Sequence, residues 1–208
     1  MENRNNITEL VFILDRSGSM AGLESDTIGG FNAMLAKQKK EEGEAFVTTV
    51  LFDTRHEMLH DRLPLDKVPV MTDKDYCVGG GTALLDAVGA AIRQIEMIHK
   101  YARPEDVPEH TIFIITTDGH ENSSCNYSYA DIKKMIESAK KKGWEFLFLG
   151  ANIDAAAEAA RIGISRDRAA DYQATECGTQ CLFEAVHKSV AAVRRKGTLA
   201  DNWNDALK

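Results

Sequence analysis

Three short polar segments of the chain carry the residue types that bind hard metal ions. The first is DRSGS at 15–19, which directly follows an apolar run. The second is GGGT at 79–82, and the third is DG at 118–119, directly after the apolar and β-branched run TIFIITT. Together these segments supply two carboxylates and three hydroxyls, from Asp15, Asp118, Ser17, Ser19 and Thr82.

A ligand set made of oxygens, without thiolate or imidazole, favours Mg²⁺, Mn²⁺ or Ca²⁺ over zinc or copper. Magnesium takes six ligands and tends to keep bound waters, so neutral hydroxyls can hold it without cancelling its charge. Two carboxylates only balance a divalent cation, which then keeps affinity for one more anionic oxygen. The residue types therefore predict a metal site, with Mg²⁺ as cofactor and Mn²⁺ or Ca²⁺ as alternatives, whose last position takes a partner's carboxylate.

Strand-like and helix-like patterns alternate along the chain and would position these segments. Apolar or β-branched runs predict strands at 7–14, 45–52, 57–63, 111–117, 144–150 and 170–173. Helical spacing of apolar residues predicts helices at 24–42, 82–101, 128–142, 153–162 and 176–195. This order predicts an α/β fold in which a doubly wound, mostly parallel sheet has helices on both faces. Ligands of such sheets bind at the carboxyl ends of the strands, which is where two of the polar segments begin.

The three segments resemble the metal-ion-dependent adhesion site (MIDAS) of the von Willebrand factor type A (vWA) domain. DRSGS matches the Asp-x-Ser-x-Ser motif that opens that site. Thr82 in GGGTALLDA matches the family's Thr, and Asp118 in TTDG matches its Asp after a central strand. The resemblance extends roughly from Thr8 to Arg195. It implies a Rossmann-like three-layer sandwich with one short antiparallel edge strand, which the segment 57–63 fits, and a domain of the compact stand-alone bacterial or phage type.

The resemblance also implies a role for each residue of the site. Ser17 and Ser19 usually touch the metal directly, and Thr82 does so in the ligand-competent state. Asp15 and Asp118 act directly or through water. Loop residues around the site would tune the choice of partner, and we expect this rim to comprise Arg16, Met20, Gly79, Gly80, His120 and Glu121.

Members of the vWA family are mainly binding modules, found in adhesion proteins and as partners of ATPase machines. The resemblance therefore implies a non-enzymatic module for metal-ion-dependent protein–protein interaction. Its partner would be a protein that presents an Asp or Glu carboxylate, such as an ATPase or another intracellular machine. In some relatives, closing the ligand shell of the metal shifts the last helix.

Each segment also has a plain structural interpretation. DRSGS can be a strand-to-helix turn in which Asp15 and Ser17 cap the next helix, GGGT a helix start, and TDG a common turn. Three such coincidences at one edge of a sheet are harder to explain than one metal site. The enzymatic alternative is a Mg²⁺-dependent phosphohydrolase with Asp15 as nucleophile. One common phosphatase pattern needs a second acid two positions later, where this chain has Ser17.

HEMLH at 56–60 matches the HExxH motif of zinc proteases. That motif needs a helix, whereas here it follows the predicted strand at 45–52 and is closely followed by Pro64. On a strand, residues four apart are separated by about 13 Å, too far for both histidines to bind one ion. We therefore expect exposed polar residues on an edge strand. Cys177 and Cys181, at the start of the last helix, are expected to be reduced and half-buried.

Composition narrows the remaining classes of function. With 25 Lys and Arg against 32 Asp and Glu, the formal net charge is −7, and no basic stripe points to nucleic acid. No apolar stretch approaches the ~18 residues of a membrane span, and the start MENRNNITEL lacks the apolar stretch of a secretion signal. Four cysteines in 208 residues are few for a disulfide framework. We expect a cytoplasmic protein without nucleic-acid or membrane partners, with one vWA domain at 1–197 and a loosely held polar tail at 198–208.

Overall fold

The computed structural model describes residues 6–200 and 202–207, and these contain a six-stranded sheet in the order β3-β2-β1-β4-β5-β6. The strands are β1 (Ile7–Asp15), β2 (Glu44–Phe52), β3 (His56–Pro64), β4 (His110–Thr117), β5 (Glu145–Gly150) and β6 (Ala169–Asp171). Neighbouring strands are parallel except for β2 and β3, which are antiparallel. The predicted doubly wound, mostly parallel sheet with one antiparallel edge strand is confirmed.

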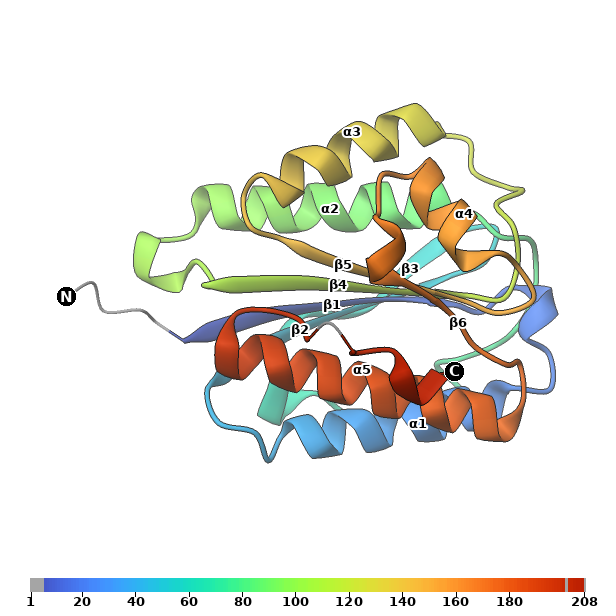
Figure 1. Ribbon diagram of the computed structural model, residues 1–208, viewed down its shortest axis with the longest axis horizontal. Coiled ribbons are helices and arrows are strands. Elements are labelled where there is room, and N and C mark those ends of the chain that lie inside the picture. Colours follow the sequence, from blue (N-terminus) through green and yellow to red (C-terminus); the bar gives the residue numbers. More distant parts are fainter. Residues whose placement is uncertain (1–5, 201, 208) are drawn as a thin grey trace.

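Helices cover both faces of this sheet (Figure 1). One face carries α1 (Glu24–Gln38) and α5 (Glu176–Lys196), and the other carries α2 (Leu84–Tyr101), α3 (Tyr129–Lys140) and α4 (Ala155–Arg161). Short 3-10 turns occur at Gly18–Met20, Leu65–Lys67, Pro104–Asp106, Arg166–Arg168 and Asp205–Leu207. Within the described part of the chain, none of these helices combines the length and the apolar character needed to span a bilayer.

The central strand β1 links the two hydrophobic cores. All nine of its residues are buried, and successive side chains of a strand point to opposite faces of the sheet. Leu10 and Phe12 pack in the core beneath α1 and α5, whereas Val11 and Ile13 pack in the core beneath α2 and α3. A continuous apolar run is what a strand buried on both faces requires, and this strand carries the first polar segment at its carboxyl end.

The HEMLH segment lies on the antiparallel edge strand β3, so its two histidines are not on one face of a helix. The expectation that its polar residues are exposed holds for His56 but is wrong for His60, which is buried. Helix α1 covers this position, and the Phe31 ring stacks on the imidazole at a centroid distance of 6.5 Å. Thr49 Oγ1 lies 3.0 Å from His60 Nδ1, which provides the buried ring with a polar partner.

The C-terminal tail is packed against the domain, so the expectation of a loosely held end is wrong for its described residues. Leu199 and Trp203 are buried and belong to the core beneath α1 and α5. The indole N–H of Trp203 donates to the carbonyl oxygen of Asp167 at 2.8 Å. Asp201 and Lys208 lie outside the described residues.

Candidate functional site

The carboxyl ends of β1 and β4 meet at one edge of the sheet, on the right in Figure 1. These strands are parallel neighbours with Leu14 opposite Thr116. One residue further along, the Thr117 hydroxyl donates to Asp15 Oδ2 at 2.6 Å. Asp118 follows directly, so the two predicted carboxylates lie at the same edge, where ligands of doubly wound sheets bind.

The backbone after β1 makes a tight turn in which Ser17 N–H donates to Asp15 Oδ1 at 2.7 Å. A 3-10 turn follows at Gly18–Met20, and the Ser17 side chain does not cap it. Helix α1 begins only at Glu24, with Leu23 at its N-cap position and no side-chain cap. The plain structural interpretation of DRSGS as a helix cap is therefore wrong, and the Ser17 hydroxyl is available for another role.

The hydroxyls extend from this turn to the third segment. Ser17 Oγ lies 3.1 Å from Ser19 Oγ, and Ser19 Oγ donates to Asp118 Oδ1 at 2.5 Å. Thr82 joins them, because a Cβ built on Gly119 would lie 3.5 Å from both Ser19 Oγ and Thr82 Oγ1. The structure thus brings together all five residues that the sequence singled out for a metal.

The site is buried on one side and open on the other. Asp15 and Ser17 are each 1% exposed, Thr82 is 2% and Asp118 is 4% exposed, whereas Ser19 is exposed to solvent. An external oxygen atom would therefore approach the group from the side of Ser19.

Burial disfavours the ionised form of both carboxylates. It raises the pKa of Asp15, although hydrogen bonds from Ser17 and Thr117 oppose the shift, and the nearby charge of Asp118 raises it further. Burial also raises the pKa of Asp118, against the hydrogen bond from Ser19. When both of these buried carboxylates are ionised, the site carries two negative charges that burial disfavours.

No side-chain cation compensates these charges within the described part of the chain, where neither aspartate makes an ion pair. The nearest basic residue in sequence, Arg16, turns away: its Nε lies 2.9 Å from Asp53 Oδ2 and its Nη1 lies 2.9 Å from Glu57 Oε2. Among the described residues no three His, Cys, Asp or Glu side chains gather as metal ligands. A metal would thus depend on the hydroxyls as well as on the two carboxylates, and this donor set fits a hard divalent cation.

The glycine loop is held in place by backbone contacts to the first segment. Gly18 N–H donates to Gly80 O at 3.1 Å, and Gly79 N–H donates to Arg16 O at 3.0 Å. Gly80 has a φ of 73°, a left-handed conformation that favours glycine. The sequence needs glycine here so that the loop can turn and bring Thr82 to the site.

Two acidic residues, Glu121 and Asp86, hold the loop that follows Asp118 against the start of α2. The sequence did not predict this role for either of them. Glu121 accepts hydrogen bonds from Leu85 N–H at 2.9 Å and from Ser124 N–H at 2.7 Å. Asp86 accepts from the backbone N–H groups of Cys125, Asn126 and Tyr127 at 2.9–3.0 Å. The position of Asp86 in the first turn of a helix is a feature that the sequence does reveal. Its hydrogen-bond partners could not be predicted, because they lie 39 to 41 residues away in the sequence. We call this arrangement the acidic clasp.

The structure presents only part of the predicted rim to solvent. Gly80 and His120 are exposed and Gly79 is half-buried, and His120 Nδ1 lies 3.7 Å from Glu158 Oε2. Met20 is buried in the 3-10 turn, so its side chain does not belong to a rim. Arg16 is held by its two ion pairs, and Glu121 is committed to the acidic clasp.

Comparisons with known proteins agree with this geometry at the level of the fold. The family model described as "VWA domain containing CoxE-like protein" matches residues 1–182. No curated protein matches the chain. The vWF domain of the type V pili tip protein Mfa5 from Porphyromonas gingivalis superposes with a TM-score of 0.64 at 11% identity, covering 93% of this chain and 98% of that one.

Two further similar structures belong to chains that are much longer than the part matched by this chain. The von Willebrand factor type A protein from Catenulispora acidiphila has a TM-score of 0.61 and 18% identity, over 89% of this chain and 42% of that one. Proximal thread matrix protein 1 from the mussel byssus, solved with a zinc-occupied MIDAS motif, has a TM-score of 0.60 and 16% identity, over 88% of this chain and 46% of that one. This chain thus spans less than half the length of either protein. By its family match over most of its length, it belongs to the VWA domain containing CoxE-like proteins.

Proposed function

We propose that this chain is a metal-dependent protein-binding domain. A divalent cation, Mg²⁺ with Mn²⁺ or Ca²⁺ as alternatives, would be held at the carboxyl edge of the sheet, and a carboxylate of a partner protein would complete its coordination. The residues that would hold the cation are Asp15, Ser17, Ser19, Thr82 and Asp118.

The observation that carries the proposal is the uncompensated pair of buried carboxylates beside three hydroxyls. Burial raises the pKa of both Asp15 and Asp118, the charge of Asp118 adds to the shift of Asp15, and neither carboxylate makes an ion pair with a basic side chain of the described residues. A buried charge is tolerated when it is paired or coordinates a metal. A bound divalent cation would supply that positive charge and keep enough of it to attract an anionic oxygen from outside.

The chain's own residues define how a partner would approach. Thr117 and the backbone of Ser17 orient the Asp15 carboxylate through hydrogen bonds of 2.6 and 2.7 Å. Ser19 stands at the solvent side, and Gly80 and His120 are also exposed. A partner's Asp or Glu side chain would therefore approach from this side, and His120 would contribute to the choice among acidic partners.

Isothermal titration calorimetry of the purified protein with Mn²⁺ and with Mg²⁺ tests whether the site binds a metal ion. We expect Asp118→Ala and Ser19→Ala to weaken binding at least tenfold, which corresponds to about 1.4 kcal/mol. Ser25→Ala, an exposed hydroxyl in α1, is the matched control and should bind as the unaltered protein does. Equal affinity in all four proteins would contradict the site.

Affinity capture from a cell extract tests the partner part. Proteins retained in Mg²⁺ should elute with chelator and should be missing from the Ser17→Ala column. Retention that resists chelator would argue for binding elsewhere on the surface. The phosphohydrolase alternative is tested by a phosphatase screen in Mg²⁺, in which we expect no turnover; turnover that is lost in Asp15→Asn would favour the enzyme instead.

A further inference from the structure

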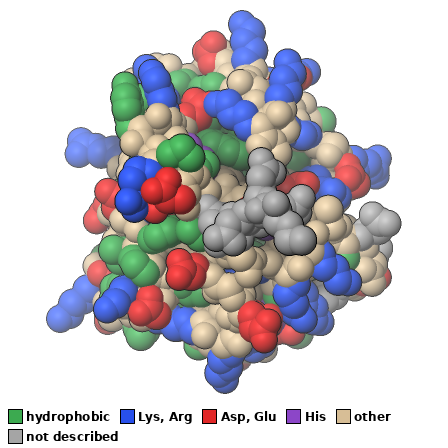
Figure 2. All heavy atoms as spheres, turned by 90° about the vertical axis from the view of Figure 1, so that its left-hand side faces the viewer, with side chains coloured by type: hydrophobic (Ala, Val, Ile, Leu, Met, Phe, Trp, Pro, Cys, Tyr) green, Lys and Arg blue, Asp and Glu red, His purple; other side chains and the backbone are tan. Residues whose placement is uncertain are grey.

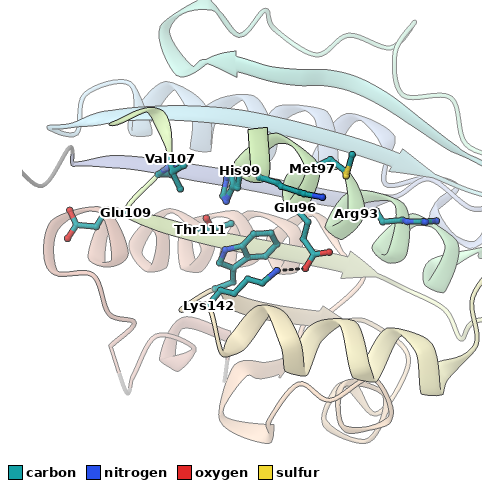
Figure 3. Close-up of a pocket in the computed structure, with 11 residues that line it drawn as sticks. Arg93, Glu96, Met97, His99, Val107, Glu109, Thr111 and Lys142 are labelled. Atoms are coloured by element: carbon teal, nitrogen blue, oxygen red, sulfur yellow. Dashed lines mark hydrogen bonds and ion pairs between the residues drawn. The ribbon is translucent and has the colours of Figure 1, made fainter. Parts of the chain in front are cut away.

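A second recess lies at the opposite edge of the sheet, where β4 and β5 begin. It has a cavity volume of about 590 Å³, within the range of pockets that bind ligands. Its walls come from the last turns of α2, the start of β4 and the turn before β5 (Figure 3). We call it the amino-edge groove and define it by Arg93, Met97, Lys100, Pro108 and Trp144.

The floor of the amino-edge groove is aromatic and firmly packed. The Trp144 ring stacks on Phe113 at a centroid distance of 5.4 Å. The His99 ring meets the same indole edge-on at 5.3 Å. Trp144 is 7% exposed and Lys142 Nζ lies 5.7 Å from its ring centroid, so an apolar side chain of a binding partner would contact a small part of this rigid floor.

Apolar surface continues from the groove onto the outside of α2. Met97 is 51% exposed and Tyr101 is 71% exposed, and residues four apart on a helix are neighbours. Together with Val70 they are the large hydrophobic side chains exposed among the described residues. Because the apolar surface runs beyond the recess, it suits a protein segment better than a small molecule.

The groove is lined by side chains of both signs: the cations are Arg93, Lys100 and Lys142, and the carboxylates are Glu96 and Glu109. Its Glu96 carboxylate is already paired with Lys142 at 2.6 Å (dashed line in Figure 3). In contrast, Arg93 and Lys100 are exposed and have no carboxylate partner within the described part of the chain. Figure 2, which faces this edge, shows green side chains with both blue and red ones around them. The lining therefore has one more basic than acidic side chain, although the chain as a whole carries a formal charge of −7.

We propose that the amino-edge groove docks an acidic protein segment that carries a large apolar side chain beside its carboxylates. The apolar side chain packs on Trp144 and Met97, and the carboxylates pair with Arg93 and Lys100. The groove contains no residue of the candidate metal centre. This docking is thus independent of the cation, and the domain joins two partners at opposite edges of one sheet.

A fluorescein-labelled, terminally blocked peptide of sequence DELFED is a suitable probe, used in chelator so that no metal contributes. We expect saturable binding by fluorescence anisotropy, with Kd on the order of 100 µM, that weakens as salt is raised. The double variant R93E/K100E should bind at least tenfold more weakly, and M97S at least threefold. The matched control K40E/K67E reverses two exposed lysines outside the groove and should bind normally.

Two-dimensional NMR locates the binding. The indole N–H signal of Trp144 should shift on titration, while that of Trp203, the chain's other tryptophan, should not. Circular dichroism verifies that each variant is folded. Equal binding of the amide analogue NQLFQN, unchanged binding to R93E/K100E, or an unshifted Trp144 signal would overturn the proposal. Self-association in ultracentrifugation that R93E/K100E abolishes would show that a second copy occupies the groove and would overturn it as well.

Discussion

Asp15 is a buried carboxylate whose ionisation opposes folding. Its raised pKa means that the folded state holds the proton more tightly than the unfolded chain. Stability therefore falls as the pH rises from the ordinary Asp pKa, near 3.9, through the raised value in the folded state. Above that range, the buried charge of Asp15 destabilises the fold unless a cation compensates it.

This reasoning predicts the behaviour of Asp15→Asn. The amide keeps the shape of the carboxyl group but removes the buried charge. Its oxygen can still accept from Ser17 N–H, and its NH₂ can donate to the Thr117 hydroxyl, which retains Gly119 O as its own acceptor. We expect the metal-free variant to be more stable than the unaltered protein at pH 7, by on the order of 1 kcal/mol, and to lose the stabilisation by Mg²⁺. Thermal unfolding with chelator and with Mg²⁺ measures both effects. A variant that is less stable in chelator would contradict the account of Asp15.

At the residue scale, the sequence predicted which side chains come together but not what surrounds them. The five oxygen-bearing residues converge because they follow strand ends or precede a helix, and sequence patterns locate those positions. Arg16 and Glu121 were predicted to lie on the rim, but both side chains are held by partners that no local sequence pattern reveals. Asp53 and Glu57 hold Arg16, and the backbone N–H of Leu85, at the start of α2, donates a hydrogen bond to Glu121.

At the scale of elements, helix α1 ends earlier than its periodicity predicts. The pattern extends to residue 42, whereas the helix ends at Gln38. The guanidinium of Arg194, on α5, donates to the carbonyl oxygens of Gln38, at 2.7 Å, and of Gly43, at 2.8 Å. This arginine thus adds a donor to the carbonyl at the helix end, which also accepts from Glu41 N–H, and to carbonyls of the turn that follows. A contact across 156 residues of sequence could not be predicted from local spacing.

Arg194 is therefore expected to be a major source of stability. Arg194→Met leaves several carbonyl oxygens without their donor, and we expect a loss of about 2–4 kcal/mol in the free energy of unfolding. Its neighbour Arg195 is a matched control, because its side chain is 60% exposed and Arg195→Ala should cost less than about 1 kcal/mol. Urea denaturation measures both; similar losses would show that the buried contacts of Arg194 contribute little.

The acidic clasp gives a prediction with a pH dependence. Burial alone would raise the pKa of Asp86, but the backbone hydrogen bonds from Cys125, Asn126 and Tyr127 outweigh it and lower the pKa. The stabilisation is thus present above the ordinary Asp pKa of about 3.9 and is lost as the pH falls through the lower folded value.

We expect Asp86→Asn to lower the free energy of unfolding by about 1–3 kcal/mol at pH 7. The difference from the unaltered protein should narrow below about pH 3.9. Asp66→Asn, at an exposed carboxylate, should leave stability unchanged over the same range. Urea titrations at several pH values test this, and a deficit that does not vary with pH would mean that the charge of Asp86 is unimportant.

At the scale of the whole molecule, alternating strand and helix patterns predicted the architecture, but the packing of the tail escaped prediction. The sequence of the tail is mostly polar and therefore predicted a loosely held end. In the structure, Trp203 is buried in the core beneath α1 and α5. Trp203→Ala should therefore cost about 3–5 kcal/mol, measured by thermal unfolding. A loss below about 1 kcal/mol would show that the tail is dispensable for stability.

The central claim is that oxygens from three separated segments hold one divalent cation. A crystal structure grown in MnCl₂, with an anomalous difference map, tests it most directly. The account predicts a single strong peak among Ser17 Oγ, Ser19 Oγ and the carboxylates of Asp15 and Asp118, and its disappearance in Asp118→Ala. A well-ordered site without a peak, or with a lysine or arginine side chain in place of the cation, would contradict it.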